Sequence, residues 1–174
     1  MLLKVREPMK DNVPAGNGSY TDDYKKALRK CGELLSRRDY SEAKLTEKLL
    51  EADLSPEAVR DAIEEMKKAH YLDDRRLAAS FVRSYLGKRS LLRIRQDLKE
   101  RGISGEIIDD VFAGLDREDA ADAEMGQIRA FLVKKNYSPE TASYSDKQKL
   151  MASLYRRGYD PELIRKAVDT GGYS

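Results

Sequence analysis

The sequence contains a single cysteine, a single histidine and no tryptophan, and only 7% of its residues are aromatic. Because Cys31 has no second thiol to pair with, an internal disulfide framework is excluded. No run approaches the ~18 apolar residues that a membrane-spanning helix needs, and Met1 to Lys4 lack the features of a signal peptide. We therefore expect a soluble, cytoplasmic protein without a membrane partner, in which Cys31 is a small buried apolar residue.

Charged residues are abundant instead, at 37% of the sequence, above the roughly 25% that is usual in globular domains. The net charge of +2 conceals two blocks of opposite sign. Residues 75–101 hold nine basic and two acidic side chains, whereas residues 102–126 hold one basic and eight acidic side chains. Such a basic block attracts polyanions when its charges share a surface. The alternative is that both blocks are simply solvated helix faces.

One segment with a helical pattern is written three times, beginning at Ser41, Ser90 and Asp146. Apolar residues coincide at four places in all three copies: Leu45, Ile94 and Leu150; Leu49, Leu98 and Leu154; Leu54, Ile103 and Tyr159; Val59, Ile108 and Ile164. The first two places are separated by one helical turn, which is typical of an amphipathic helix. Three matched copies in the same order indicate an internal helical repeat.

Each copy carries the signals that end one helix and begin the next. Gly102 and Gly158 favour the left-handed conformation that closes a helix, and Asp53, a weaker terminator, stands at the equivalent place. The following helices start at Ser55-Pro56-Glu57, Ser104-Gly105-Glu106 and Asp160-Pro161-Glu162. In each triplet a side-chain oxygen can cap a free backbone N–H group, and the glutamate complements the helix dipole.

A further segment with helical periodicity precedes each copy, at about 22–36, 74–87 and 117–135. Three short helices can enclose one small core, and units this small are stabilised by stacking on their neighbours. We predict an all-α fold of three tandem three-helix bundle repeats, in an elongated array that can curve. The predicted boundaries are 1–19 for a disordered N-terminal segment, 20–72, 73–115 and 116–170 for the three repeats, and 171–174 for a frayed C-terminus.

Recognisable catalytic and metal-binding patterns are missing from the sequence. His70 and Cys31 lie in different predicted helices, and the sequence has no zinc motif and no glycine-rich phosphate loop. Asp73 and Asp74 form the one notable carboxylate pair. At a helix start such residues are normally caps, with a metal or acid–base role as the alternative. We expect a protein that is not an enzyme and has no cofactor and no metal site.

The central copy carries a characteristic string of residues: Tyr71-Leu72-Asp73-Asp74-Arg75-Arg76-Leu77-Ala78, then Phe81-Val82, Gly87 and Ile94, and finally Leu98-Lys99-Glu100-Arg101-Gly102-Ile103. This order and spacing resemble the RecX family. Residues 34–41 are similar to the opening of that family, and residues 155–159 to its last repeat. The resemblance spans about residues 24–168. It departs from the family in the loop from Asn136 to Ser145, which is longer and contains Pro139.

The resemblance implies a three-repeat helical regulator that lies in the groove of the RecA–DNA filament. Members of the family typically lower ATP hydrolysis, strand exchange and co-protease activity of RecA, which places them in DNA repair, homologous recombination and the SOS response. The implied partners are the RecA filament and single- or double-stranded DNA. We expect the protein itself to be a monomer.

Basic residues are the candidate contacts to DNA phosphate or to an acidic filament surface, because arginine in particular suits two-point phosphate binding. The first set is Arg75, Arg76, Arg83, Lys88, Arg89, Arg93, Arg95, Lys99 and Arg101; the second basic patch is Lys134, Lys135, Lys147, Lys149, Arg156 and Arg157. Four tyrosines are candidates for stacking on bases, although packing is favoured for the first and last of them: Tyr85, Tyr137, Tyr144 and Tyr155.

A second hypothesis is an independent nucleic-acid-binding protein built from helix-turn-helix-like repeats. It is motivated by the basic block at 75–101 and by the short helix–glycine–helix connections.

Overall fold

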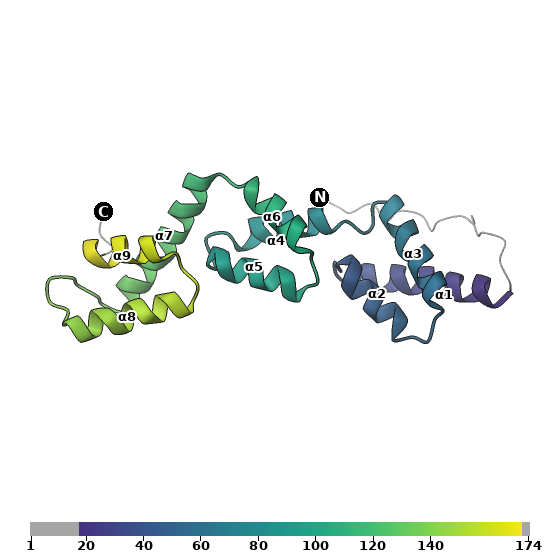
Figure 1. The fold of residues 1–174 in the computed structure, drawn as a ribbon, viewed down its shortest axis with the longest axis horizontal. Helices are drawn as coiled ribbons and strands as arrows, with labels where there is room; N and C mark the ends of the chain where they lie inside the picture. Colours follow the sequence, from purple (N-terminus) through teal and green to yellow (C-terminus); the bar gives the residue numbers. More distant parts are fainter. Residues whose placement is uncertain (1–17, 172–174) are drawn as a thin grey trace. The chain divides into compact units, whose positions relative to one another are not determined.

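The computed structural model of the protein describes residues 18–171, and within them it contains nine helices and no strand. The helices follow in chain order (Figure 1): α1 (Gly18–Leu35), α2 (Glu42–Leu50), α3 (Pro56–Lys68), α4 (Asp74–Tyr85), α5 (Leu91–Glu100), α6 (Gly105–Ala113), α7 (Arg117–Lys134), α8 (Tyr144–Arg156) and α9 (Pro161–Thr170). The predictions for residues 1–17 and 172–174 lie outside the described residues. The prediction of an all-α fold with three-helix repeats is confirmed.

The chain divides into two compact units, one ending at Leu72 and the other starting at Asp73. In the first unit α1 packs mainly against α3, and α2 packs against both. Its core includes Cys31, which is fully buried as predicted, and burial raises the pKa of this thiol to about 12. Leu45 and Leu49, the apolar stripe of the first copy, are fully buried in the same core.

The second unit contains two repeats, each with a core of its own. The stripe residues Ile94 and Leu98 of α5 are fully buried against α4 and α6. In the last repeat α7 packs against α9, and Leu154 of α8 is fully buried between them. The apolar spacing of the sequence therefore predicts the inward face of these helices correctly.

The ends of the helices match the predicted turn chemistry at three equivalent positions. Asp53, Gly102 and Gly158 have φ angles of 53°, 82° and 81°, so all three adopt the left-handed conformation that closes a helix. Asp73 caps α4 by accepting a hydrogen bond from the Arg76 N–H group at 2.9 Å. The interpretation of the Asp73–Asp74 pair as a helix start is confirmed.

Some predicted helix boundaries differ from the structure. Helix α1 begins at Gly18, before the predicted start at about 22, and α4 ends at Tyr85, because Gly87 then takes a φ of 75°. Helix α8 begins at Tyr144, two residues before the aligned Asp146, because Ser143 caps it by accepting a hydrogen bond from the Asp146 N–H group at 3.2 Å.

The predicted cap at Ser55 also differs from the structure. The hydroxyl of this residue makes no cap hydrogen bond to α3. Its backbone N–H group instead donates to the carboxylate of Asp23 at 3.1 Å, which ties the start of α3 to α1. The distinction between a side-chain cap and a backbone donor depends on a tertiary contact that the local sequence does not contain.

The described part of the chain offers neither a membrane-spanning helix nor a cluster of metal ligands. None of its helices combines the length and the apolar character needed to cross a membrane. Among the same residues there is no cluster of three or more histidine, cysteine, aspartate or glutamate side chains that could hold a metal ion.

Candidate nucleic-acid interface

The basic and acidic blocks of the sequence partly neutralise each other within the second repeat. Arg75 of α4 forms an ion pair with Asp110 of α6 at 2.5 Å, and Arg95 of α5 forms one with Asp109, also at 2.5 Å. The two blocks of opposite sign are therefore not separated in space at these pairs. Surface ion pairs of this kind contribute little stability, but each one occupies a cation that we predicted to face a ligand.

Other members of the first set pack on aromatic rings or remain at the surface. The guanidinium of Arg101 lies 4.6 Å from the centre of the Phe81 ring, and Arg76 is exposed. Among the described residues, Arg83, Lys88 and Lys99 are exposed and have no acidic partner within ion-pair distance: they are the freest cations of the first set.

Two stretches of basic residues that lie far apart in the sequence meet in one groove of the second unit. The groove has a volume of about 350 Å³ and lies between the start of α5 and the end of α8. Its cationic lining consists of Lys88, Arg89 and Arg93 from the first set and Arg156 and Arg157 from the second patch. We call this the joint groove, because it lies where the second and third repeats meet.

Two large apolar side chains are exposed in the joint groove. Leu92 is 50% exposed and Tyr155 is 40% exposed, and both line it. A groove that combines cations with an accessible ring and an aliphatic side chain suits a ligand with both anionic and apolar parts. Nucleotides have this composition, because phosphates alternate with bases that stack on aromatic rings.

The rest of the second patch lies outside the joint groove. Lys147 donates a hydrogen bond to Asp169 at 2.6 Å, which raises the pKa of the lysine. Lys135 and Lys149 line a different cavity of about 470 Å³ beside the loop that follows α7. Lys134 is exposed at the end of α7. The second patch is therefore not one surface, and only Arg156 and Arg157 join the first set.

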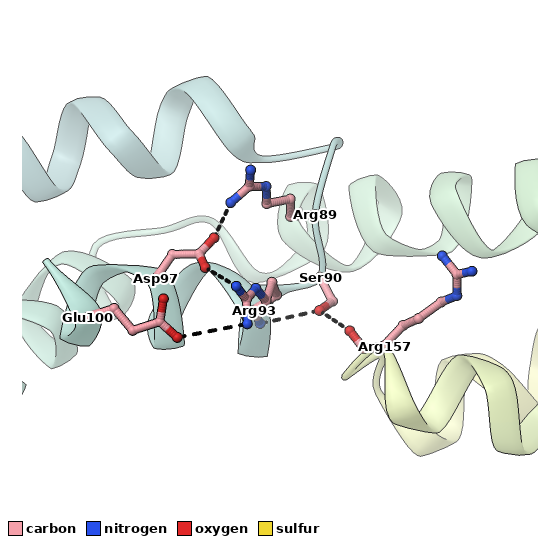
Figure 2. Close-up of polar contacts among 6 residues, drawn as sticks. All are labelled: Arg89, Ser90, Arg93, Asp97, Glu100 and Arg157. Carbon is pink, nitrogen blue, oxygen red and sulfur yellow. Dashed lines mark hydrogen bonds and ion pairs between the residues drawn. The ribbon is translucent and has the colours of Figure 1, made fainter.

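A buried carboxylate lies beneath the joint groove (Figure 2). Asp97 of α5 is only 6% exposed, and its two oxygens pair with two arginines of the groove. One oxygen accepts a hydrogen bond from Arg89, and the other lies 2.9 Å from a guanidinium nitrogen of Arg93. Arg89 also stacks on the ring of Tyr85, with 4.3 Å between the guanidinium carbon and the ring centre.

Hydrogen bonds across the joint hold the two sides of the groove together. The Ser90 hydroxyl donates to the carbonyl oxygen of Arg157 at 2.7 Å, as Figure 2 shows. Gln127 of α7 donates to the carbonyl oxygen of Arg89 at 3.3 Å and accepts from the Tyr159 hydroxyl at 3.2 Å. The groove is therefore built from both repeats of the second unit, which these hydrogen bonds connect.

Glu124 of α7 forms a further contact between the second and third repeats. Its carboxylate is 3% exposed and accepts a hydrogen bond from the Leu91 N–H group, the first of α5, at 3.0 Å. Burial raises the pKa of Glu124, while the hydrogen bonds from the backbone of Leu91 and Asp160 act in the opposite direction. This carboxylate thus caps α5 from a different repeat.

Two of the four candidate tyrosines, Tyr137 and Tyr155, differ from their predicted roles. Tyr137, a candidate for base stacking, is buried, and its hydroxyl donates to the carbonyl oxygen of Val168 at 3.1 Å. Tyr155, for which packing was favoured, is exposed in the joint groove, whereas Tyr144 is 79% exposed at the start of α8. Tyr85 is half-buried against Phe81, as expected.

Sequence reasoning missed the residues that support the groove. Asp97 follows Arg93 by one helical turn, so the helical spacing of opposite charges could have identified that pair. The hydrogen bond from Leu91 to Glu124 joins two different repeats. Glu124 lies in an acidic stretch, and nothing in the local sequence distinguishes it from its acidic neighbours.

Three family descriptions match the chain in order. The one named RecX, first three-helix domain, matches residues 26–66. RecX, second three-helix domain, matches residues 73–111, and RecX, third three-helix domain, matches residues 122–168. Each match falls on one set of three helices.

Individual relatives are similar over most of the chain. The regulatory protein RecX of Trichlorobacter lovleyi is 33% identical over 159 residues, which cover 88% of this chain and 98% of the relative. The regulatory protein RecX of Legionella pneumophila strain Corby is 31% identical over 142 residues, or 81% of this chain and 91% of the relative. The crystal structure of RecX from Lactobacillus salivarius is similar in fold, with a TM-score of 0.71 at 19% identity over 86% of this chain and 96% of that chain.

Proposed function

This chain belongs to the RecX family, and from that premise we propose that it is a regulatory protein that binds the RecA–DNA filament and lowers the ATPase, strand-exchange and co-protease activities of RecA. The proposal places the protein in the cytoplasm, as a monomer that acts in homologous recombination, DNA repair and the SOS response. Its role is to bind, with no chemical step of its own.

The observation that carries the proposal is the joint groove. Five cations and two exposed apolar side chains line it, and the second and third repeats both contribute. A nucleoprotein filament presents phosphates beside protein, so it offers a partner for each kind of side chain. The acidic residues of α6 that stay exposed, such as Glu106, help to orient the protein on such a mixed surface.

The same groove also supports the second hypothesis, an independent nucleic-acid-binding protein. The two hypotheses differ in what they predict for bare DNA. Electrostatic binding to DNA alone weakens steeply with salt, with a log–log slope of roughly −0.9 per phosphate neutralised on duplex. A filament ligand has protein contacts in addition, so its binding persists at salt concentrations that remove it from bare DNA.

Fluorescence anisotropy of the labelled protein separates these alternatives. The titrants are RecA filaments assembled on single-stranded DNA with a slowly hydrolysed ATP analogue, and the same DNA without RecA, over a range of salt. We expect tighter and less salt-dependent binding to the filament. Equal affinity for the two titrants at every salt concentration would support the second hypothesis and contradict the first.

A pair of double variants connects the assay to the joint groove. Lys88→Gln with Arg156→Gln removes two exposed cations of the groove, and we expect about three- to tenfold weaker binding to the filament. Arg165→Gln with Lys166→Gln on α9 removes the same charge from exposed positions outside the groove. This control is expected to bind almost as well as the unaltered protein.

A further inference from the structure

Asp97 occupies an unusual place for an acidic residue, since it is buried beneath a groove whose charged lining is entirely cationic. A buried carboxylate is costly unless it is paired and hydrogen-bonded. Asp97 meets this requirement with two arginines at once, one from the loop before α5 and one from α5 itself. The same pairing restricts the side chains of the two arginines.

Both guanidinium groups are held in place by Asp97. Arg89 is fixed between the Asp97 carboxylate and the face of the Tyr85 ring. The Arg93 guanidinium pairs with the second oxygen of Asp97, one helical turn away. The backbone N–H group of Arg93 donates to the Ser90 hydroxyl at 3.3 Å. An unrestrained arginine samples many rotamers and loses that freedom on binding. Arginines that are already fixed lose less.

Pairing leaves the arginines able to bind a ligand. A guanidinium has five N–H donors, and the side chains of Arg89 and Arg93 remain 41% and 49% exposed. Two arginines and one aspartate still carry a net positive charge. Lys88 and Arg156 lie on the same groove without any ion-pair partner among the described residues, and supply attraction without fixed geometry.

We propose that the joint groove is a binding site for the phosphodiester backbone of single-stranded DNA, and that Asp97 is the positioning residue that holds Arg89 and Arg93 toward a phosphate. The ring of Tyr155 and the side chain of Leu92 then meet a base adjacent to that phosphate. This inference deepens the proposed function and rests on it for the biological setting, but DNA binding at this site is measurable without RecA.

The Asp97→Asn variant distinguishes a positioning role from a purely electrostatic one, because the two predict opposite changes in DNA affinity. If charge alone governs binding, removal of an acidic group beside the groove makes the protein more positive and its binding to DNA tighter. If Asp97 positions the arginines, the amide cannot pair with both guanidinium groups, and binding becomes weaker. We expect about tenfold weaker binding of a fluorescent oligodeoxythymidylate, measured by anisotropy at low salt.

Glu100→Gln is the matched control. Glu100 lies on the same helix, its side chain is 67% exposed, and it approaches Arg93 only to 3.9 Å. Its neutralisation changes the net charge as Asp97→Asn does, and leaves the Asp97 pairs intact. We expect unchanged or slightly tighter DNA binding. If Asp97→Asn and Glu100→Gln have the same effect, Asp97 has no positioning role and the proposal is overturned.

Arg93→Lys keeps the test decisive if the Asp97 variant unfolds, because this change retains the charge and removes the planar fork. We expect about fivefold weaker DNA binding, whereas Arg165→Lys, at an exposed position of α9 outside the groove, leaves binding unchanged. Far-UV circular dichroism checks that each variant is folded. Equal binding by the two lysine variants would also overturn the proposal.

Measurements with the oligonucleotide and with RecA distinguish a failure of the DNA site from a failure of the proposed function. If the unaltered protein fails to bind the oligonucleotide but binds the RecA filament, the phosphodiester assignment is wrong and an acidic protein surface is the ligand of the groove. If it binds the oligonucleotide and has no effect on RecA, the proposed function fails while the site stands.

Discussion

The hydroxyl group of Ser90 joins two residues that are 67 positions apart in the chain, because it donates a 2.7 Å hydrogen bond to the carbonyl oxygen of Arg157. The Ser90 hydroxyl oxygen also accepts a hydrogen bond from the backbone N–H group of Arg93 and so caps α5. Ser90 is 2% exposed. One side chain therefore both begins a helix of the second repeat and fastens it to the third.

Ser90→Ala is expected to destabilise the second unit more than loss of a cap alone. Ser104→Ala is the control, because Ser104 caps α6 through the same kind of hydrogen bond but is exposed and lies between two helices of the same repeat. Loss of a cap costs about 1 kcal/mol, and loss of the partly buried hydrogen bond to Arg157 costs about 0.5–1.5 kcal/mol more. Urea unfolding of the two variants measures the difference. Equal losses would show that the hydrogen bond to Arg157 does not stabilise the joint.

Gly158→Ala tests how closely the repeats approach each other. Gly158 has a φ of 81°, and a Cβ atom there would lie 3.1 Å from the Cβ and Cδ2 atoms of Leu92. The left-handed conformation alone costs an alanine roughly 1–2 kcal/mol, so we expect a loss of at least that size in the free energy of unfolding.

Gly126→Ala provides a control of opposite sign. Gly126 is exposed inside α7, where a Cβ atom would meet nothing within 4 Å. Alanine is favoured over glycine in a helix by up to about 1 kcal/mol, so this variant is expected to be more stable than the unaltered protein. A Gly158→Ala variant that is as stable as Gly126→Ala would contradict the described geometry of the joint.

The raised pKa of Glu124 predicts how the stability of the protein depends on pH. Because burial raises its pKa in the folded protein, the folded state binds this proton more tightly than the unfolded state does. The associated stability is fully present below the ordinary glutamate pKa and is lost as pH rises through the raised value.

The measurement compares the unaltered protein with Glu124→Gln by urea unfolding at several pH values on the acidic side of neutrality. The stability of the unaltered protein relative to Glu124→Gln should increase as pH falls through this window. Asp122→Asn, which removes an exposed carboxylate from the same helix, serves as the control. A relative stability that stays constant or decreases on acidification would contradict the assignment of the titrating group to Glu124.

Cys31 is expected to be chemically inert while the first unit is folded. It is fully buried, and its pKa is raised to about 12, so at pH 8 very little of it is the reactive thiolate. Labelling with a disulfide reagent should be slow in buffer and fast in urea. Rapid labelling under native conditions would show that the core around Cys31 opens readily.

The repetitive part of the fold was predictable because its signals are local. The spacing of Leu45 and Leu49, and of Ile94 and Leu98, identifies the buried face of each helix, and the left-handed positions at Asp53, Gly102 and Gly158 could be found by alignment alone. The start of α8 was predicted too late in the sequence, because Ser143, three residues before the aligned Asp146, caps this helix.

The candidate site was predicted only as a list of charges. The sequence identifies Arg89, Arg93 and Arg157 as basic, but the groove they share depends on how two repeats meet. Likewise, the pairing of Arg75 with Asp110 depends on the packing of α4 against α6. Contacts of this kind are set by tertiary structure, so a linear charge pattern cannot distinguish a neutralised cation from an available one.

The central claim is that the protein regulates RecA by binding its filament, and ATP hydrolysis by RecA on single-stranded DNA is the most direct measurement of it. The protein is titrated from well below to stoichiometric amounts relative to RecA, with Lys88→Gln/Arg156→Gln and the Arg165→Gln/Lys166→Gln control run in parallel. We predict a progressive fall in the hydrolysis rate with the unaltered protein and the control, and a weaker fall with the groove variant. A rate that stays unchanged at stoichiometric protein would contradict the account.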